Sequence, residues 1–147
     1  MCGICGEFRF DNIKISNVRS NRMMRAITSR GPDHTGEFIA KNIFLGHKRL
    51  SVIDTSLKSN QPLEDDNLII VFNGVIFNYK ELKDILINKG YSFFSRGDTE
   101  VILKSYLHYG EDVVNHLDGV FSFSIYDKNK NELFCARDRL GIKPFYY

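Results

Sequence analysis

The chain has 147 residues, enough for one domain with a sizeable core. Lys and Arg total 20 against 18 for Asp and Glu, and this net charge of +2 argues against nucleic acid or an anionic membrane as a partner. The hydrophobic fraction of 43% is that of a globular protein and excludes disorder along the whole chain. No apolar run approaches the roughly 20 residues of a membrane span.

Targeting signals and cysteine usage predict where the protein works. The N-terminus reads MCGICGEFRF and lacks the basic segment and long apolar stretch of a signal peptide. The 3 cysteines, at positions 2, 5 and 135, are an odd number that does not suit a secreted disulfide framework. We therefore expect a soluble, cytoplasmic protein.

The N-terminal half of the chain predicts strands around one short helix. The helix is indicated by Met23, Met24 and Ile27 at helical spacing, and its arginines 19, 22 and 25 form either an anion site or a solvated face, of which we favour the second. The expected elements are a strand at 3–10, the helix at 18–29, a Gly- and Pro-containing loop at 30–36, strands at 37–40 and 43–52, a polar loop at 55–67 and a buried strand at 68–72.

The C-terminal half predicts two helices followed by a β-hairpin. Asn78 with Glu81 three residues later has the pattern of a capping box, and Gly90 ends that helix. The other expected elements are a helix at 99–109 ended by Gly110, strands at 120–126 and 132–136, and a turn at 127–131. Strands that bracket two central helices predict an α+β fold with a mostly antiparallel sheet.

Cys2 is the residue most clearly suited to catalysis. If Met1 is removed, the Cys2 thiol lies beside its own free α-amine. An α-amine has a reference pKa of about 7.7 to 8.0, so it can accept a proton near neutral pH and return it to a leaving group. Nucleophile and base then come from one residue, which is the chemistry of N-terminal nucleophiles.

Cys2 and Cys5 also allow two other interpretations. Together they match the C-x-x-C pattern of redox proteins, but that pair needs a helix N-terminus, whereas this segment reads as a strand. A zinc site would need further ligands, and the four histidines are scattered along the sequence. We therefore expect neither a redox pair nor a metal site.

Eight segments, in family order, resemble the motifs of the class II glutamine amidotransferases, which belong to the N-terminal nucleophile hydrolases. The resemblance is closest to the glutamine-hydrolysing asparagine synthetases and implies an α/β/β/α sandwich. The segments are MCGICG at the N-terminus, RGPD at 30–33 with Gly36, HKRLSVID at 47–54, QP at 61–62, NGVIFN at 73–78, GDTEVI at 97–102, LDGVFSF at 117–123 and RDRLGIKP at 137–144.

The resemblance implies a role for each matching residue. Cys2 would attack the side-chain amide of L-glutamine and form a thioester, while the Asn73 side chain and the Gly74 backbone N–H would stabilise the oxyanion. Asn-Gly after a buried strand suits that role, although the sequence alone favours an ordinary turn. The substrate-binding residues would be Arg49 for the α-carboxylate, Leu50, Ser51, Val52 and Ile53 along the pocket wall, Val75, and Asp98 for the ammonium group. Asp98 is also well placed to cap a helix.

Two departures from the family pattern bear on function. Val75 stands where asparagine synthetases have a Glu that helps bind the substrate amino group, so affinity and substrate choice remain open there. The sequence ends before the final strands and before the ATP-dependent synthetase domain that uses the ammonia. We therefore interpret residues 1–147 as an incomplete type-2 amidotransferase domain without a cofactor of its own, with ATP and Mg²⁺ expected only in the absent synthetase domain or subunit.

Three functions are compatible with these residues. The first is glutamine hydrolysis that supplies ammonia for asparagine synthesis from aspartate. The second is an amidotransferase for a different carboxylate, for example that of a sugar. The third is a truncated, inactive remnant or regulatory module with the same fold, an interpretation that Val75 and the early end of the sequence favour.

Overall fold

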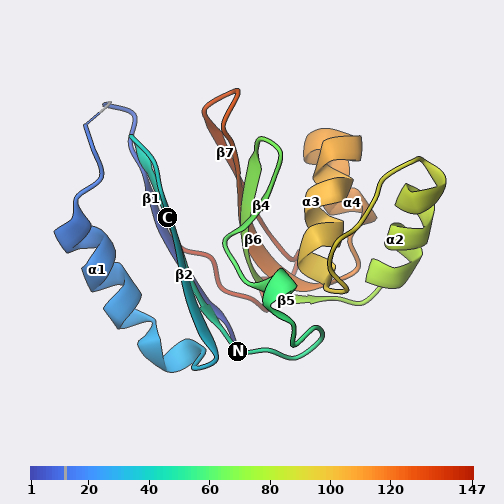
Figure 1. Ribbon diagram of the computed structural model, residues 1–147, viewed down its shortest axis with the longest axis horizontal. Coiled ribbons are helices and arrows are strands. Elements are labelled where there is room, and N and C mark those ends of the chain that lie inside the picture. Colours follow the sequence, from blue (N-terminus) through green and yellow to red (C-terminus); the bar gives the residue numbers. More distant parts are fainter. Residues whose placement is uncertain (12) are drawn as a thin grey trace.

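Two β-sheets lie face to face in the computed structural model, which describes residues 1–11 and 13–147 (Figure 1). The strands are β1 (Gly3–Phe8), β2 (His34–Ile39), β3 (Ile43–Arg49), β4 (Leu63–Asp65), β5 (Leu68–Ile76), β6 (Gly119–Asp127) and β7 (Glu132–Arg137). The α-helices are α1 (Asn17–Ala26), α2 (Tyr79–Asn88), α3 (Asp98–Tyr109) and α4 (Val113–His116), and short 3₁₀ helices are η1 (Thr28–Arg30), η2 (Leu57–Ser59) and η3 (Gly110–Asp112).

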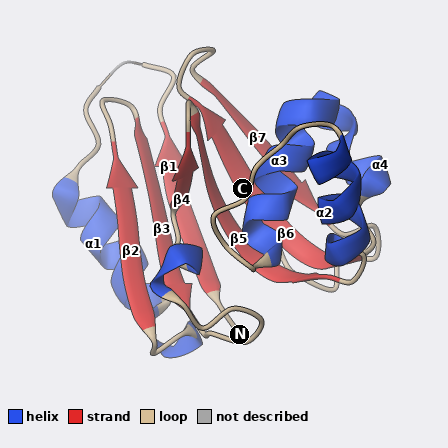
Figure 2. Cartoon of the chain, turned by 45° about the vertical axis from the view of Figure 1, so that its right-hand side comes forward, coloured by secondary structure: helices blue, strands red, loops and turns tan. Residues whose placement is uncertain are grey.

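Every strand pair in both sheets is antiparallel. The first sheet has the order β1-β3-β2 and the second β4-β5-β6-β7. Helix α1 covers the outer face of the first sheet, and α2, α3 and α4 cover the outer face of the second (Figure 2). The predicted α+β class and α/β/β/α layering are therefore confirmed.

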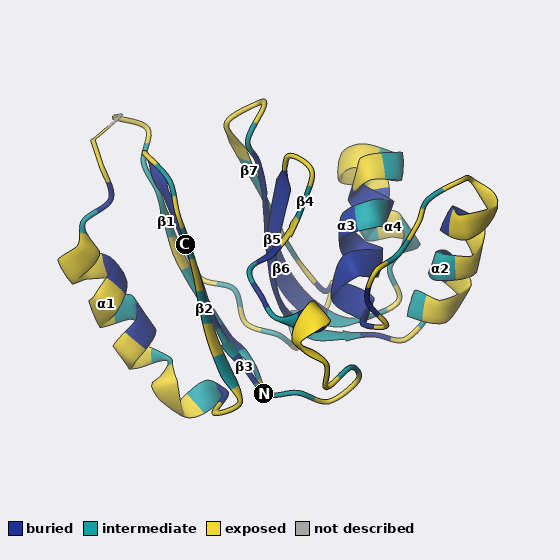
Figure 3. Ribbon diagram, in the orientation of Figure 1, coloured by how far each residue is buried: buried dark blue, intermediate teal, exposed yellow. Residues whose placement is uncertain are grey.

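The core is divided among the layers because strand side chains alternate between two faces. Leu45 of β3 and Val71 of β5 pack in the cluster between the sheets. Ile70 and Phe72 point to the opposite face of β5, where they pack against Ile102 of α3. Strands β3, β5 and β6 and the first half of helix α3 are accordingly almost continuously buried (Figure 3).

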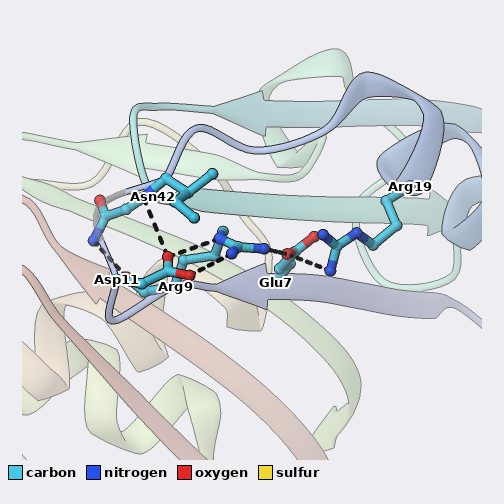
Figure 4. Close-up of polar contacts among 6 residues, drawn as sticks. Glu7, Arg9, Asp11, Arg19 and Asn42 are labelled. Carbon is cyan, nitrogen blue, oxygen red and sulfur yellow. Dashed lines mark hydrogen bonds and ion pairs between the residues drawn. The ribbon is translucent and has the colours of Figure 1, made fainter.

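Polar contacts as well as packing attach α1 to the first sheet. Met24 packs on Phe44 of β3, while Glu7 of β1 pairs with Arg19 at 3.0 Å and with Arg9 at 3.1 Å (Figure 4). Arg9 also pairs with Asp11. Because Arg19 pairs with Glu7, and because the arginines at 22 and 25 are exposed, the structure supports a solvated helix face rather than an anion site.

Three predicted boundaries are wrong in ways that matter for the site. The loop predicted at 30–36 already enters β2 at His34, and the loop predicted at 55–67 contains η2 and β4. The strand predicted at 68–72 continues to Ile76, because β6 pairs with it along its whole length. The Asn73-Gly74 pair therefore lies inside a strand and does not form a turn.

The helix ends are only partly as predicted. Gly90 and Gly110 follow α2 and α3 with φ of 93° and 61°, conformations that other residues rarely adopt. Asn78 does not cap α2 with its side chain. That side chain instead accepts a hydrogen bond from Asp118 N–H at 3.0 Å and donates one to His116 O at 2.9 Å, so it joins α2 to the start of β6. None of the helices described here is long and apolar enough to cross a membrane.

Replacement of Gly36 by alanine should destabilise the fold, because β2 passes against the chain before β4. A Cβ at Gly36 would overlap the Gln61 carbonyl and lie 3.1 Å from Pro62 Cδ. We expect Gly36→Ala to lower the free energy of unfolding by about 1–3 kcal/mol, the usual cost of overpacking. Urea denaturation measures this loss. Thr35→Ala, at an exposed position of the same strand, is the matched control and should cost less than about 1 kcal/mol. Equal stability of the two variants would contradict the close approach.

Candidate active site

A cavity of about 140 Å³ lies at the end of the sandwich where β1 begins. It is smaller than the roughly 300–1,000 Å³ pockets of drug-sized ligands and suits a ligand of few atoms. Its wall contains nine of the ten residues that the sequence marks as catalytic or substrate-binding: Cys2, Arg49, Leu50, Val52, Ile53, Asn73, Gly74, Val75 and Asp98. The tenth, Ser51, is held beside the cavity, where its N–H donates to Asp33 Oδ2 at 2.7 Å.

Cys2 is fixed by contacts from Leu50 and Arg30. Leu50 N–H donates to Cys2 Sγ at 3.4 Å, and the thiol lies 3.5 Å from Leu50 O. Arg30 Nε–H donates to Cys2 O at 3.4 Å. The RGPD segment therefore holds the Cys2 main chain through Arg30 and the main chain of Ser51, next to Leu50, through Asp33.

Cys5 does not join Cys2 in a redox pair. Its sulfur lies 3.6 Å from Met24 Sδ, in the layer between the first sheet and α1. Cys2, Cys5 and Cys135 are all free thiols. Within residues 1–11 and 13–147, no group of three or more His, Cys, Asp and Glu side chains is arranged to hold a metal ion.

The free edge of β5 explains how Gly74 can present its N–H to the cavity. In an antiparallel strand the main-chain groups of alternate residues point to opposite sides. Phe72 and Ile76 point away from β6, since their N–H groups donate to Gln61 Oε1 at 2.6 Å and to Asp98 Oδ2 at 3.1 Å. Gly74 lies between them with the same orientation, at a point that β4 does not reach.

Arg49 is buried, and part of its guanidinium group is already engaged. Both Nη1 hydrogens donate, to Ser56 O at 2.9 Å and to Asn60 Oδ1 at 2.7 Å, and Nη2 donates to Asp54 O. Among the residues that the structure describes, Nε–H and the second Nη2–H have no acceptor. In a guanidinium, Nε–H and the Nη2–H on the same side form the pair of parallel donors that a planar carboxylate accepts.

Asp98 is a buried carboxylate at the first turn of α3. Gly97, not Asp98, is the N-cap residue, so the capping alternative is wrong. Burial raises the pKa of Asp98 to about 6, although the hydrogen bond from Ile76 N–H works in the opposite direction. The carboxylate is therefore mostly ionised at neutral pH and can attract a cationic group in the cavity.

Several cavity residues have no role in the sequence analysis. Gln61, Thr99 and Lys143 lie in quoted motifs but received none, since a motif match does not say where a side chain points. Lys143 Nζ lies 2.8 Å from Met1 Sδ, so the segment after β7 returns to the N-terminus.

Asp54 links three segments of the cavity wall, because its carboxylate accepts hydrogen bonds from Ser59 Oγ and from Arg96 N–H. Although burial works against it, these bonds keep the pKa of Asp54 below its usual range.

A larger cavity, of about 1,000 Å³, lies on another side of the molecule. It opens between β1 and β7, and the last four residues of the chain line part of it. Tyr146 and Tyr147 are exposed there. Cys2 lines the smaller cavity and is not among the lining residues of this larger one.

Comparison with known proteins identifies the class. A family model described as a glutamine amidotransferase domain matches residues 1–147, and the chain belongs to this family. It is 39% identical to asparagine synthetase [glutamine-hydrolyzing] 3 of Bacillus subtilis and 38% identical to the amidase chyE of Penicillium rubens. Each match covers 100% of this chain but only 25% and 24% of the relative, so the chain spans about a quarter of their length.

Solved structures support the fold. Glutamine phosphoribosylpyrophosphate amidotransferase from B. subtilis superposes with a TM-score of 0.57 at 26% identity, over 68% of this chain and 24% of that one. The allosteric regulatory enzyme of purine biosynthesis gives 0.57 at 22% identity, over 71% and 25%, and this likeness concerns the fold alone. The predicted resemblance to N-terminal nucleophile amidotransferases is confirmed.

The three thiols should differ in their reaction with iodoacetamide at pH 8. Burial raises the pKa of Cys5 to about 11 and also raises the pKa of Cys135. Because the thiolate is the reacting form, Cys5 should be labelled about two orders of magnitude more slowly than a free cysteine, and Cys2 should be labelled first. Peptide mass spectrometry measures the three rates, and the urea-unfolded chain, in which the rates should converge, is the control. Labelling of Cys5 as fast as that of Cys2 would refute the prediction.

Proposed function

We propose that this chain hydrolyses the side-chain amide of L-glutamine, with Cys2 as nucleophile. The observation that carries the proposal is that a member of the glutamine amidotransferase family has a thiol, an Asn-Gly strand edge, a guanidinium and a carboxylate around one small cavity. The free thiols and the odd cysteine count favour the cytoplasm as the place where it works.

Substrate binding would use the two charged groups of the cavity. The free Nε–H and Nη2–H of Arg49 would hold the α-carboxylate of glutamine through parallel hydrogen bonds. Asp98 would hold the α-ammonium group. The segment of residues 50–53 and Val75 would enclose the aliphatic part of the side chain, and this placement would direct the amide carbon toward Cys2.

The reaction would need Cys2 as the first residue, because its α-nitrogen lies in a peptide bond while Met1 is present. The free α-amine would take the thiol proton as sulfur attacks the amide carbon, and the carbonyl π-electrons would move to oxygen. Asn73 Nδ2 and Gly74 N–H would stabilise this oxyanion. The α-ammonium would then protonate the leaving nitrogen, so that ammonia departs and a thioester remains. Water would finally hydrolyse the thioester to glutamate and regenerate the thiol.

The ammonia would serve an ATP-dependent synthetase domain or subunit. Two relatives from B. subtilis are named glutamine-hydrolysing asparagine synthetases, at 39% and 42% identity over 100% of this chain. Asparagine formation from aspartate is therefore the synthesis that we propose. ATP and Mg²⁺ would act in the synthetase part, and this domain would need no cofactor.

A different ammonia acceptor is the second candidate. The relative from P. rubens is named an amidase, at nearly the same identity of 38%. Val75 also gives the cavity an apolar wall where the asparagine synthetase motif has an acid. These two observations favour an amidotransferase that shares the glutaminase chemistry and differs in its acceptor.

Loss of the Cys2 thiol should abolish glutaminase activity. The test compares the chain that begins at Cys2 with its Cys2→Ala variant and with a Cys5→Ala control, and it measures glutamate and ammonia released from glutamine. We expect no activity above background for Cys2→Ala and activity within about threefold of the parent for Cys5→Ala, whose sulfur lies toward α1. Undiminished turnover by Cys2→Ala would overturn the nucleophile assignment. A folded but inactive parent would support the inactive remnant instead.

Glutamine binding should weaken when Asp98 becomes protonated. Its pKa of about 6 means that the carboxylate loses its charge as the pH falls through 6, and with it the attraction for the substrate ammonium. In the Cys2→Ala variant, which separates binding from turnover, we expect a Kd for glutamine about tenfold higher at pH 5 than at pH 7.5. Calorimetry measures both values. Cys2→Ala combined with Asp98→Asn should bind glutamine weakly at both pH values. A Kd of the Cys2→Ala variant that does not change with pH would contradict the role of Asp98.

A further inference from the structure

Two buried side chains take the place of a missing strand beside β5. Strand β4 pairs with β5 only as far as Ile70, which is opposite Leu63. At Phe72, two residues further on, the N–H donates to Gln61 Oε1 at 2.6 Å, and the carbonyl accepts from His47 Nε2 at 3.2 Å. Both main-chain groups of Phe72 are thus held by side chains from other parts of the chain.

Burying His47 costs free energy, which indicates that its hydrogen bond to the Phe72 carbonyl has a structural or functional purpose. Its side chain is fully buried between the sheets, and burial lowers its pKa to about 4, so the ring is neutral near pH 7. A carbonyl can only accept, so Nε2 must carry the ring hydrogen and Nδ1 is left bare. Nδ1 has no hydrogen-bond partner in the described part of the chain, a situation that costs free energy and that an apolar residue would avoid.

Gln61 connects the same point of β5 to helix α3. Its side chain is buried and uses both ends, because Nε2 donates to Thr99 Oγ1 at 3.2 Å while Oε1 accepts from Phe72. Thr99 follows Asp98, and Asp98 in turn accepts from Ile76 N–H. The strand is therefore held on both sides of Gly74, at Phe72 and at Ile76, and the Gly74 N–H between them stays directed at the cavity.

We propose that His47 and Gln61 are positioning residues for the oxyanion donors of Asn73 and Gly74, and that they act by holding Phe72. This inference rests on the proposed glutaminase function. The Phe72 carbonyl belongs to the same planar peptide unit as Asn73 N. A hydrogen bond that holds this carbonyl therefore also holds the position of the Asn73 backbone nitrogen and Cα. Oxyanion donors must be held to within about 0.5 Å of the productive geometry, and a loose strand edge would not achieve this.

The test uses two matched pairs of variants in the chain that begins at Cys2. His47→Met and Gln61→Met keep the side-chain volume approximately and remove the hydrogen bond to Phe72. His47→Gln keeps an N–H donor at a similar distance, and Gln61→Glu keeps an acceptor oxygen. Thermal unfolding followed by circular dichroism selects the conditions in which every variant is folded.

Three quantities, compared with the affinity for glutamate, separate positioning from a general structural role. The first two are kcat and KM for glutamine. The third is the affinity for glutamic γ-semialdehyde, whose aldehyde carbon accepts the Cys2 sulfur while the carbonyl electron pair moves to oxygen and the thiol proton moves to the α-amine. That adduct places an oxyanion at the donors, whereas bound glutamate has a planar carboxylate and serves as the ground-state reference.

We expect the two Met variants to lose about 10- to 100-fold in kcat, less than the 10²- to 10³-fold typical of deleting an oxyanion donor itself. Affinity for the aldehyde should fall in parallel, while KM and glutamate affinity stay within about threefold. The His47→Gln and Gln61→Glu variants should recover most of the loss.

Three results would overturn the positioning role alone. The first is an active parent whose Met variants keep full kcat. The second is a fall in kcat matched by an equal rise in KM and an equal fall in glutamate affinity, and the third is no recovery of kcat in the conservative variants. A parent that neither hydrolyses glutamine nor binds the aldehyde would overturn the proposed function, and this inference with it.

Discussion

The site depends on an unpaired edge of one strand. Strand β5 is longer than its neighbour β4, so its outer edge beyond Ile70 has main-chain groups without a strand partner. Buried main-chain groups left unpaired are costly, and here side chains satisfy them at Phe72 and Ile76. Gly74, between these two, has its N–H on the same edge of β5 and lines the cavity. Because β4 ends early, a main-chain N–H of β5 lies at the cavity without a strand partner in the part of the chain that the structure describes.

The sandwich brings the remaining groups to this edge. Apolar side chains between the sheets hold β3 against β5, which carries Arg49 and the Leu50 backbone toward Asn73. Strand β1 pairs with β3, so the residue before it, Cys2, arrives at Leu50. Helix α3 packs on the other face of β5, which places Asp98 at Ile76. Each of these groups is therefore positioned by an element that also packs in the core.

Local patterns predicted elements well where the signal lies within the element itself. The apolar stripe and glycine stops of α2 and α3 are of this kind, and so is the hairpin of β6 and β7. Local sequence patterns gave wrong predictions where residues distant in sequence bind the side chain or main chain concerned. Asn78 has the pattern of a cap, but Asp118 and His116 occupy its amide. The Asn73-Gly74 pair has the pattern of a turn, but pairing with β6 keeps it extended.

The sequence by itself determined the class of fold, the amidotransferase family and the candidate reactive residues. These follow from hydrophobic periodicity and from motifs that occur in the family's order. It did not determine the extent of β5, the capping of α3 or the contacts of His47 and Gln61 with Phe72. Those depend on which main-chain groups remain unpaired once β4 ends, and on which distant side chains can reach them. Such contacts join residues 11 and 25 positions apart, and only the folded chain decides them.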